Sequence, residues 1–156
     1  MEKEITREIV VELFRKYCAS CKGHDCCVGG ELNLFKWEAE RLHLSKKAGT
    51  VGFKEGCGFC KEDGCRLQMD EKPLDCISYP VYPIVGDEKQ VMGLIVHKSC
   101  PAHHEVSRDK ELLLSVKGFW ESELQNIPAG AMAGWIDDTE DYWQATNTVK
   151  IPVKCL

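Results

Sequence analysis

The sequence contains no long apolar run. No stretch reaches the roughly 18 to 20 consecutive apolar residues that a membrane-spanning helix requires. The segment from Met1 to Glu8 is charged and lacks the apolar core of a secretory signal peptide. We therefore expect a protein without a membrane segment that resides in the cytoplasm, where thiols stay reduced.

The sequence also has no excess of positive charge. Its 20 Lys and Arg are outnumbered by 25 Asp and Glu, which gives a net charge of −5. Nucleic acid and anionic membrane surfaces are therefore not expected partners. Internal repeats and low-complexity segments are absent, as are a P-loop, a dinucleotide-binding fingerprint and a Gly-x-Ser-x-Gly elbow. Whether the protein is an enzyme stays open.

The chain is long enough for a hydrophobic core of its own, because it has 156 residues of which 44% are hydrophobic. We expect one domain over residues 1–156. The predicted fold class is α+β: a small, mostly helical, cysteine-rich domain with one β-hairpin and long loops tied together by metal. The cysteine-cluster core of this domain covers residues 18–101.

Apolar periodicity predicts the main elements. Amphipathic helices are expected over residues 3–17, 34–48 and 107–126. Two strands, 79–85 and 91–96, form the hairpin around the turn 86–90, and Pro80 and Pro83 indicate that the first strand is an edge or is broken. Extended segments are expected at 31–33 and 148–153, a short helical turn within 131–143, and irregular chain over 50–73. The third helix has an apolar stripe of Leu112, Leu113, Val116, Trp120, Leu124 and Ile127.

Ten cysteines are far more than a chain of this size ordinarily contains, and all but Cys155 lie between Cys18 and Cys100. In a reducing compartment, clustered cysteines are more often metal ligands than disulfides. We therefore favour a metal site over a scaffold of disulfide bridges. The candidate ligands are Cys18, Cys21, Cys26, Cys27, Cys57, Cys60, Cys65, Cys76 and Cys100, and Cys155 is expected to be a bystander.

The arrangement of these thiols is compatible with zinc and with an iron–sulfur cluster. A structural zinc site takes four ligands in a tetrahedron, and an iron–sulfur cluster also takes four cysteine thiolates. Two Cys-x-x-Cys pairs, Cys18/Cys21 and Cys57/Cys60, could each supply two ligands from one short loop. The adjacent Cys26 and Cys27 point apart on an extended backbone, which favours two ions or a polynuclear cluster.

Two further features leave alternatives open. His24 or His97 could join the ligands, since imidazole suits both zinc and iron. Of the histidines, His97 is the one expected to be positioned by a strand. The Cys57-Gly-Phe-Cys60 sequence superficially resembles a redox-active pair, but the Lys-Glu-Asp-Gly that follows leaves no room for the helix whose N-terminus activates such a cysteine.

In their order along the chain, these motifs resemble the cysteine-cluster family described as zinc- or iron-chelating domains. The resemblance covers roughly residues 18–101, and Cys60 is additional to the family's pattern. It implies a metal-binding fold more than a specific activity. The matching residues are Cys18, Cys21, Cys26, Cys27, Glu38, Cys57 with Phe59, Gly64-Cys65, Pro73-Leu-Asp-Cys76, Tyr79-Pro80 and Cys100-Pro101.

Three functions are consistent with this sequence. The first is a metal-binding protein that holds zinc or an iron–sulfur cluster. The second is an iron–sulfur redox or methyltransferase-like accessory enzyme, which a resemblance to flagellin lysine methylases suggests. The third is a zinc-stapled protein-interaction module, in which Trp135, Tyr142 and Trp143 would contact a protein partner of unknown identity.

Overall fold

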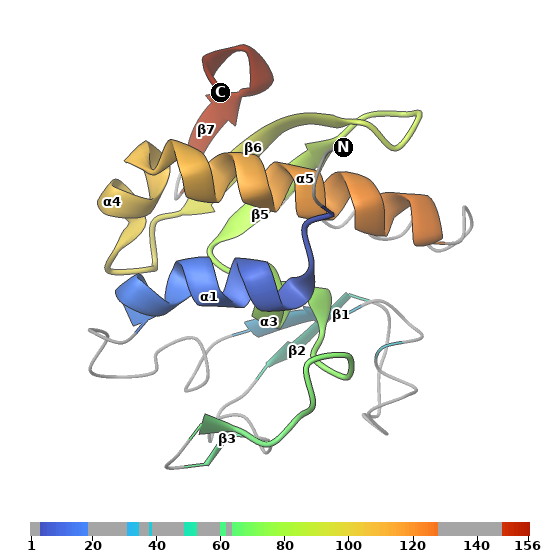
Figure 1. Cartoon of the computed structure of the whole chain (residues 1–156), viewed down its shortest axis with the longest axis vertical. Helices are drawn as coiled ribbons and strands as arrows, with labels where there is room; N and C mark the ends of the chain where they lie inside the picture. Colours follow the sequence, from blue (N-terminus) through green and yellow to red (C-terminus); the bar gives the residue numbers. More distant parts are fainter. Residues whose placement is uncertain are drawn as a thin grey trace.

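Helix α1, Arg7–Cys18, and helix α5, Lys110–Asn126, pack side by side, and α5 lies across a three-stranded antiparallel sheet (Figure 1). This computed structural model describes residues 4–18, 31–34, 38, 49–52, 60–61, 64–127 and 148–156. For the four short strands between residues 31 and 65, the description is of the backbone. The predicted helical turn within 131–143 lies outside the described residues, as does all of the predicted helix 34–48 except Leu34 and Glu38.

The three-stranded sheet has the order β5-β6-β7. Strands β5, Val81–Val85, and β6, Val91–His97, form the predicted hairpin, and β7, Thr148–Pro152, pairs with β6 on its other side. Strand β5 lies at the edge of this described sheet, which is one of the two alternatives that Pro80 and Pro83 predicted. The mixed helix and strand content confirms the α+β class. The prediction of a single hairpin is wrong, because residues 60–61 and 64–65 form a second antiparallel pair.

The core lies between this sheet and the helices. Val10 and Phe14 of α1 and the predicted stripe of α5 are buried in it, which confirms the apolar periodicity of both helices. Helix α1 begins at Arg7 rather than at residue 3. The hydroxyl of Thr6 accepts a hydrogen bond from the Ile9 N–H at 3.5 Å, which is the arrangement of an N-cap. The buried apolar residues of the core are Val10, Phe14, Leu74, Ile77, Val81, Val91, Leu94, Val96, Val106, Leu112, Leu113, Val116, Phe119, Trp120, Leu124 and Ile127.

The predicted helix 107–126 is wrong at its N-terminal end, because two helices meet there. Helix α4, His103–Arg108, ends at Asp109, whose ψ of 90° is not helical. The Asp109 carboxylate then accepts a hydrogen bond from the Leu112 N–H at 3.1 Å and caps α5. An aspartate in this role favours a new helix start over a continuous helix.

The segment 50–73, predicted to be irregular, contains short strands. Strand β1, Glu31–Leu34, pairs with β2, Gly49–Gly52, and β3, Cys60–Lys61, pairs with β4, Gly64–Cys65, both antiparallel. The extended segment predicted at 31–33 is confirmed as β1. A five-residue helix that was not predicted, α3, Leu74–Ser78, follows and contacts α1 and β1. The chain ends in a 3₁₀ turn, η1, Val153–Cys155.

Candidate metal centre

Helix α3 presents Cys76 to the surface. Of its five residues, Leu74, Asp75, Ile77 and Ser78 are buried, and Cys76 is the exposed one. This pattern of burial is the reverse of the usual one, because cysteine is among the most buried residue types and aspartate and serine are mostly exposed. Helix α3 therefore buries two polar side chains and leaves a thiol at the surface.

The buried polar residues of α3 have specific partners. The Tyr82 hydroxyl of β5 donates a hydrogen bond to Asp75 Oδ1. The Trp120 indole N–H of α5 donates to Ser78 Oγ at 2.8 Å, and the Ser78 hydroxyl donates to the Val81 carbonyl. A helix of five residues is too short to be stable by itself. These contacts hold it against the sheet and α5.

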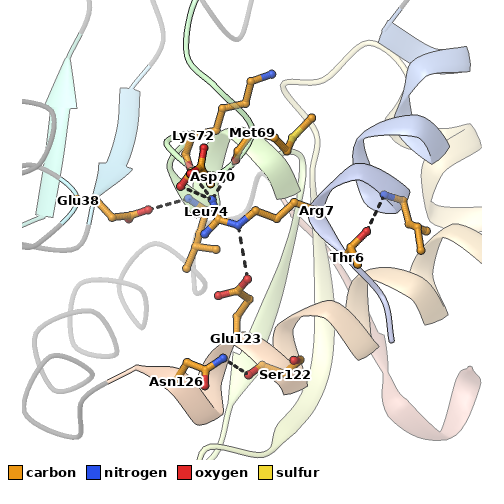
Figure 2. Close-up of polar contacts among 11 residues, drawn as sticks. Thr6, Arg7, Glu38, Met69, Asp70, Lys72, Leu74, Ser122, Glu123 and Asn126 are labelled. Carbon is orange, nitrogen blue, oxygen red and sulfur yellow. Dashed lines mark hydrogen bonds and ion pairs between the residues drawn. The ribbon is translucent and has the colours of Figure 1, made fainter. Parts of the chain in front are cut away.

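The N-terminal end of α3 is held by two side chains from elsewhere in the chain, Glu38 and Arg7 (Figure 2). Glu38, which is helical and only 1% exposed, accepts a hydrogen bond from the Leu74 N–H at 2.9 Å. Arg7 of α1 donates through Nη1 to three carbonyls of the turn that precedes α3. The Nε atom of Arg7 lies 3.5 Å from Glu123 Oε1. The three carbonyls belong to Met69, Asp70 and Lys72, at 3.2, 3.4 and 2.8 Å.

Cys60 and Cys65 occupy the same rung of one small ladder. The register of β3 and β4 places Cys60 opposite Cys65 and Lys61 opposite Gly64. Two candidate ligands are thus brought together at the level of the backbone, and one of them is the cysteine that is additional to the family pattern. Because Cys60 lies in a strand, the structure gives it no helix N-terminus of the kind that activates a redox cysteine.

Cys18 is the last residue of α1 and is exposed. The last turn of α1 is anchored to the N-terminus of α5. The Tyr17 hydroxyl donates a hydrogen bond to Asp109 Oδ2 at 2.6 Å, and Lys16 Nζ lies 2.8 Å from the same oxygen. Burial alone would raise the pKa of Asp109, but the hydrogen bonds from Lys16, Tyr17 and the Leu112 N–H lower it below its usual value. Burial raises the pKa of Tyr17, and the bond to Asp109 raises the pKa of Lys16.

Cys100 is half-buried in the turn between β6 and α4. Its carbonyl accepts hydrogen bonds from the His103 N–H at 3.0 Å and from His103 Nδ1 at 2.9 Å. His97 is the last residue of β6, which confirms that a strand positions it. Its Nδ1 accepts from the Ser99 N–H at 3.2 Å, and burial lowers its pKa, so the neutral ring is favoured. A metal could approach this ring only through Nε2.

Among the candidate ligands, the structure describes the side chains of Cys18, Cys76 and Cys100. Among 4–18, 38, 66–127 and 148–156, where side chains are described, no group of three or more Cys, His, Asp or Glu is arranged to hold a metal ion. Cys155 is exposed in η1. The predicted ligands Cys21, Cys26, Cys27 and Cys57 lie outside the described residues, as do His24 and the aromatic residues Trp135, Tyr142 and Trp143.

The contacts of Arg7 and Glu38 were not predicted from the sequence. Glu38 stood out as a motif position within an amphipathic helix, but nothing local indicates that its carboxylate reaches a backbone N–H 36 residues later. In the described part of the chain, no helix combines the length and apolar character needed to cross a membrane. Comparisons of the chain with models of protein families, with characterised proteins and with solved structures found no match.

Proposed function

We propose that this protein binds metal, as zinc or as an iron–sulfur cluster, through clustered cysteine thiolates. The proposed ligands come from Cys18, Cys21, Cys26, Cys27, Cys57, Cys60, Cys65, Cys76 and Cys100. Thiolate is the ligand that zinc and iron–sulfur clusters share. Ligation needs reduced cysteines, so the proposal includes a reducing compartment such as the cytoplasm.

The observation that carries this proposal is the exposure of Cys76 on α3. Four buried neighbours and their hydrogen bonds hold this helix, while its cysteine faces outward. Burying Asp75 and Ser78 requires partners, because an unsatisfied buried polar group costs about 1–3 kcal/mol. A cysteine that served only packing would instead be buried. An exposed thiol on a firmly held element suits a ligand whose position must be reproducible.

The placement of other candidate cysteines supports the same chemistry. Cys18 is exposed at a helix end, Cys100 is half-buried in a turn, and neither belongs to the apolar core. The rung shared by Cys60 and Cys65 brings two candidates close in the backbone with only a short loop between them. Closing such a short loop costs little conformational entropy. Pairs of this kind supply two of the four positions around a tetrahedral ion.

The test is metal analysis of the full chain purified without oxygen, together with its absorption spectrum. We expect stoichiometric zinc without visible absorption, or iron with a broad band at about 400 nm from an iron–sulfur cluster. Replacing Cys76 by serine is expected to lower the bound metal. Cys155→Ser is the matched control, since Cys155 is also exposed but lies outside the cluster. Folded protein that contains and takes up neither zinc nor iron would refute the proposal.

A further inference from the structure

Helix α3 is capped by a residue from outside its own segment. The first N–H groups of a helix have no partner within it, and Pro73 at the N-cap position has no side chain that could accept from them. The Glu38 carboxylate fills this role for the Leu74 N–H at 2.9 Å. A buried carboxylate is expensive to desolvate unless it is hydrogen-bonded. Glu38 and α3 therefore stabilise each other.

Arg7 holds the chain just before α3 in a complementary way. Its guanidinium contacts the carbonyl oxygens of the turn 69–72, whereas Glu38 contacts an N–H of residue 74. The Arg7 guanidinium thus binds backbone acceptors, and the Glu38 carboxyl group binds a backbone donor of the same short segment (Figure 2). Arg7 also pairs with Glu123, which links this segment to α5 as well as to α1.

We propose that Glu38 and Arg7 are positioning residues that set the place of Cys76 in the metal centre. This inference rests on the proposed function. Cys76 follows Leu74 by two residues within α3, so any shift of the capped end moves the thiol. Residues that orient a metal ligand without touching the metal typically change metal affinity by about 10- to 100-fold when they are replaced. Glu38 acts on the centre through the backbone of α3 and is not itself a ligand.

The experiment is a titration of the metal-free, reduced full chain with cobalt(II), followed by zinc(II) competition. Thiolate-bound cobalt absorbs visible light, and its bands report ligand geometry. Glu38→Ala removes both the charge and the acceptor of the cap, and we expect about 10- to 100-fold weaker binding with displaced cobalt bands. Glu38→Gln keeps an acceptor oxygen, so most of the affinity is expected to remain, with a loss of only a few-fold.

Val116→Ala is the control for a general loss of stability. Val116 is buried in α5, and its truncation weakens the core without removing any of the hydrogen bonds that hold α3. We expect its cobalt spectrum to match that of the unaltered chain and its affinity to stay within about twofold. Equal losses in Glu38→Ala and Val116→Ala would show that only stability matters. Equal losses in the two Glu38 variants would show that the charge matters and not the cap. Either result overturns the inference.

Arg7→Lys tests the second positioning residue and covers the case in which Glu38→Ala does not fold. Lysine keeps the charge but loses the planar fork of donors that reaches several carbonyls and Glu123 together. We expect several-fold weaker cobalt binding. Unchanged affinity in folded Arg7→Lys, or in Glu38→Ala where that variant folds, would overturn the inference while the proposed function stands. If the unaltered chain binds neither cobalt nor zinc and holds no iron–sulfur cluster, the proposed function itself fails.

Discussion

The indole N–H of Trp120 donates a hydrogen bond to Ser78 Oγ over 2.8 Å, and both side chains are buried. The Ser78 hydroxyl donates in turn to the carbonyl of Val81, the first residue of β5. This chain of contacts joins the middle of α5, the end of α3 and the start of the sheet. Helix α3, which exposes Cys76, is therefore anchored to the core at its C-terminal end as well as at its capped start.

Replacing Trp120 by phenylalanine is expected to destabilise the protein. The variant loses the hydrogen bond to Ser78 and leaves space beside the smaller ring. The two effects together should lower the free energy of unfolding by about 2–3 kcal/mol, measured by urea denaturation. Leu114→Ala, on the exposed side of the same helix, should change it by less than about 0.5 kcal/mol. Equal effects of both substitutions would contradict this assignment of Trp120.

Asp109 is expected to contribute to stability mainly as the cap of α5. Asp109→Ala removes the acceptor for the Leu112 N–H and for the Tyr17 hydroxyl. We expect a loss of about 1–2 kcal/mol in the free energy of unfolding. Asp109→Asn should lose less, because asparagine caps helices about as well as aspartate. Chemical denaturation of the two variants distinguishes capping from charge, and equal losses would assign the effect to charge.

The charge of Asp109 predicts how stability depends on pH. Its pKa is lowered in the folded chain, so the unfolded chain binds a proton more readily in acid. The contribution of the charge is present above the unfolded pKa of about 3.9 and is lost as the pH falls through the lower folded pKa. The difference in stability between the unaltered chain and Asp109→Asn should therefore be constant from about pH 7 to pH 5 and shrink below about pH 4. Growth of this difference in acid would have the wrong sign.

If the protein binds metal as proposed, removal of the metal is expected to affect strands β3 and β4 more than helix α3. Strands β3 and β4 have two residues each, and such a short ladder is marginal without further support. Helix α3 keeps its contacts with Glu38, Tyr82 and Trp120. After chelation, the amides of Cys60 and Cys65 should lose hydrogen-exchange protection, while those of α3 keep theirs. Unchanged exchange at residues 60–65 would argue that metal does not stabilise this ladder.

Local patterns in the sequence were sufficient for the elements that are long enough to show a period. The apolar spacing of α1 and α5 predicted their buried faces, since a helix of three or more turns repeats its contact with the core. Alternation and turn residues predicted the hairpin of β5 and β6. Pro80 and Pro83 predicted that its first strand is an edge or is broken, and the sheet shows it at an edge. The number and spacing of the cysteines predict a metal site, and this prediction is the basis of the proposed function.

The tertiary structure alone decided that α3 buries Asp75 and Ser78 and exposes Cys76. A helix of five residues spans too few turns to show a period, so its sequence does not reveal which side faces the core. Asp75 and Ser78 are buried because Tyr82 and Trp120 come within hydrogen-bonding reach of them. The N-terminus of α3 is capped by Glu38. The partners of Ser78 and Leu74 lie 42 and 36 residues away. Such contacts depend on the packing of whole elements, which no local pattern of residues specifies.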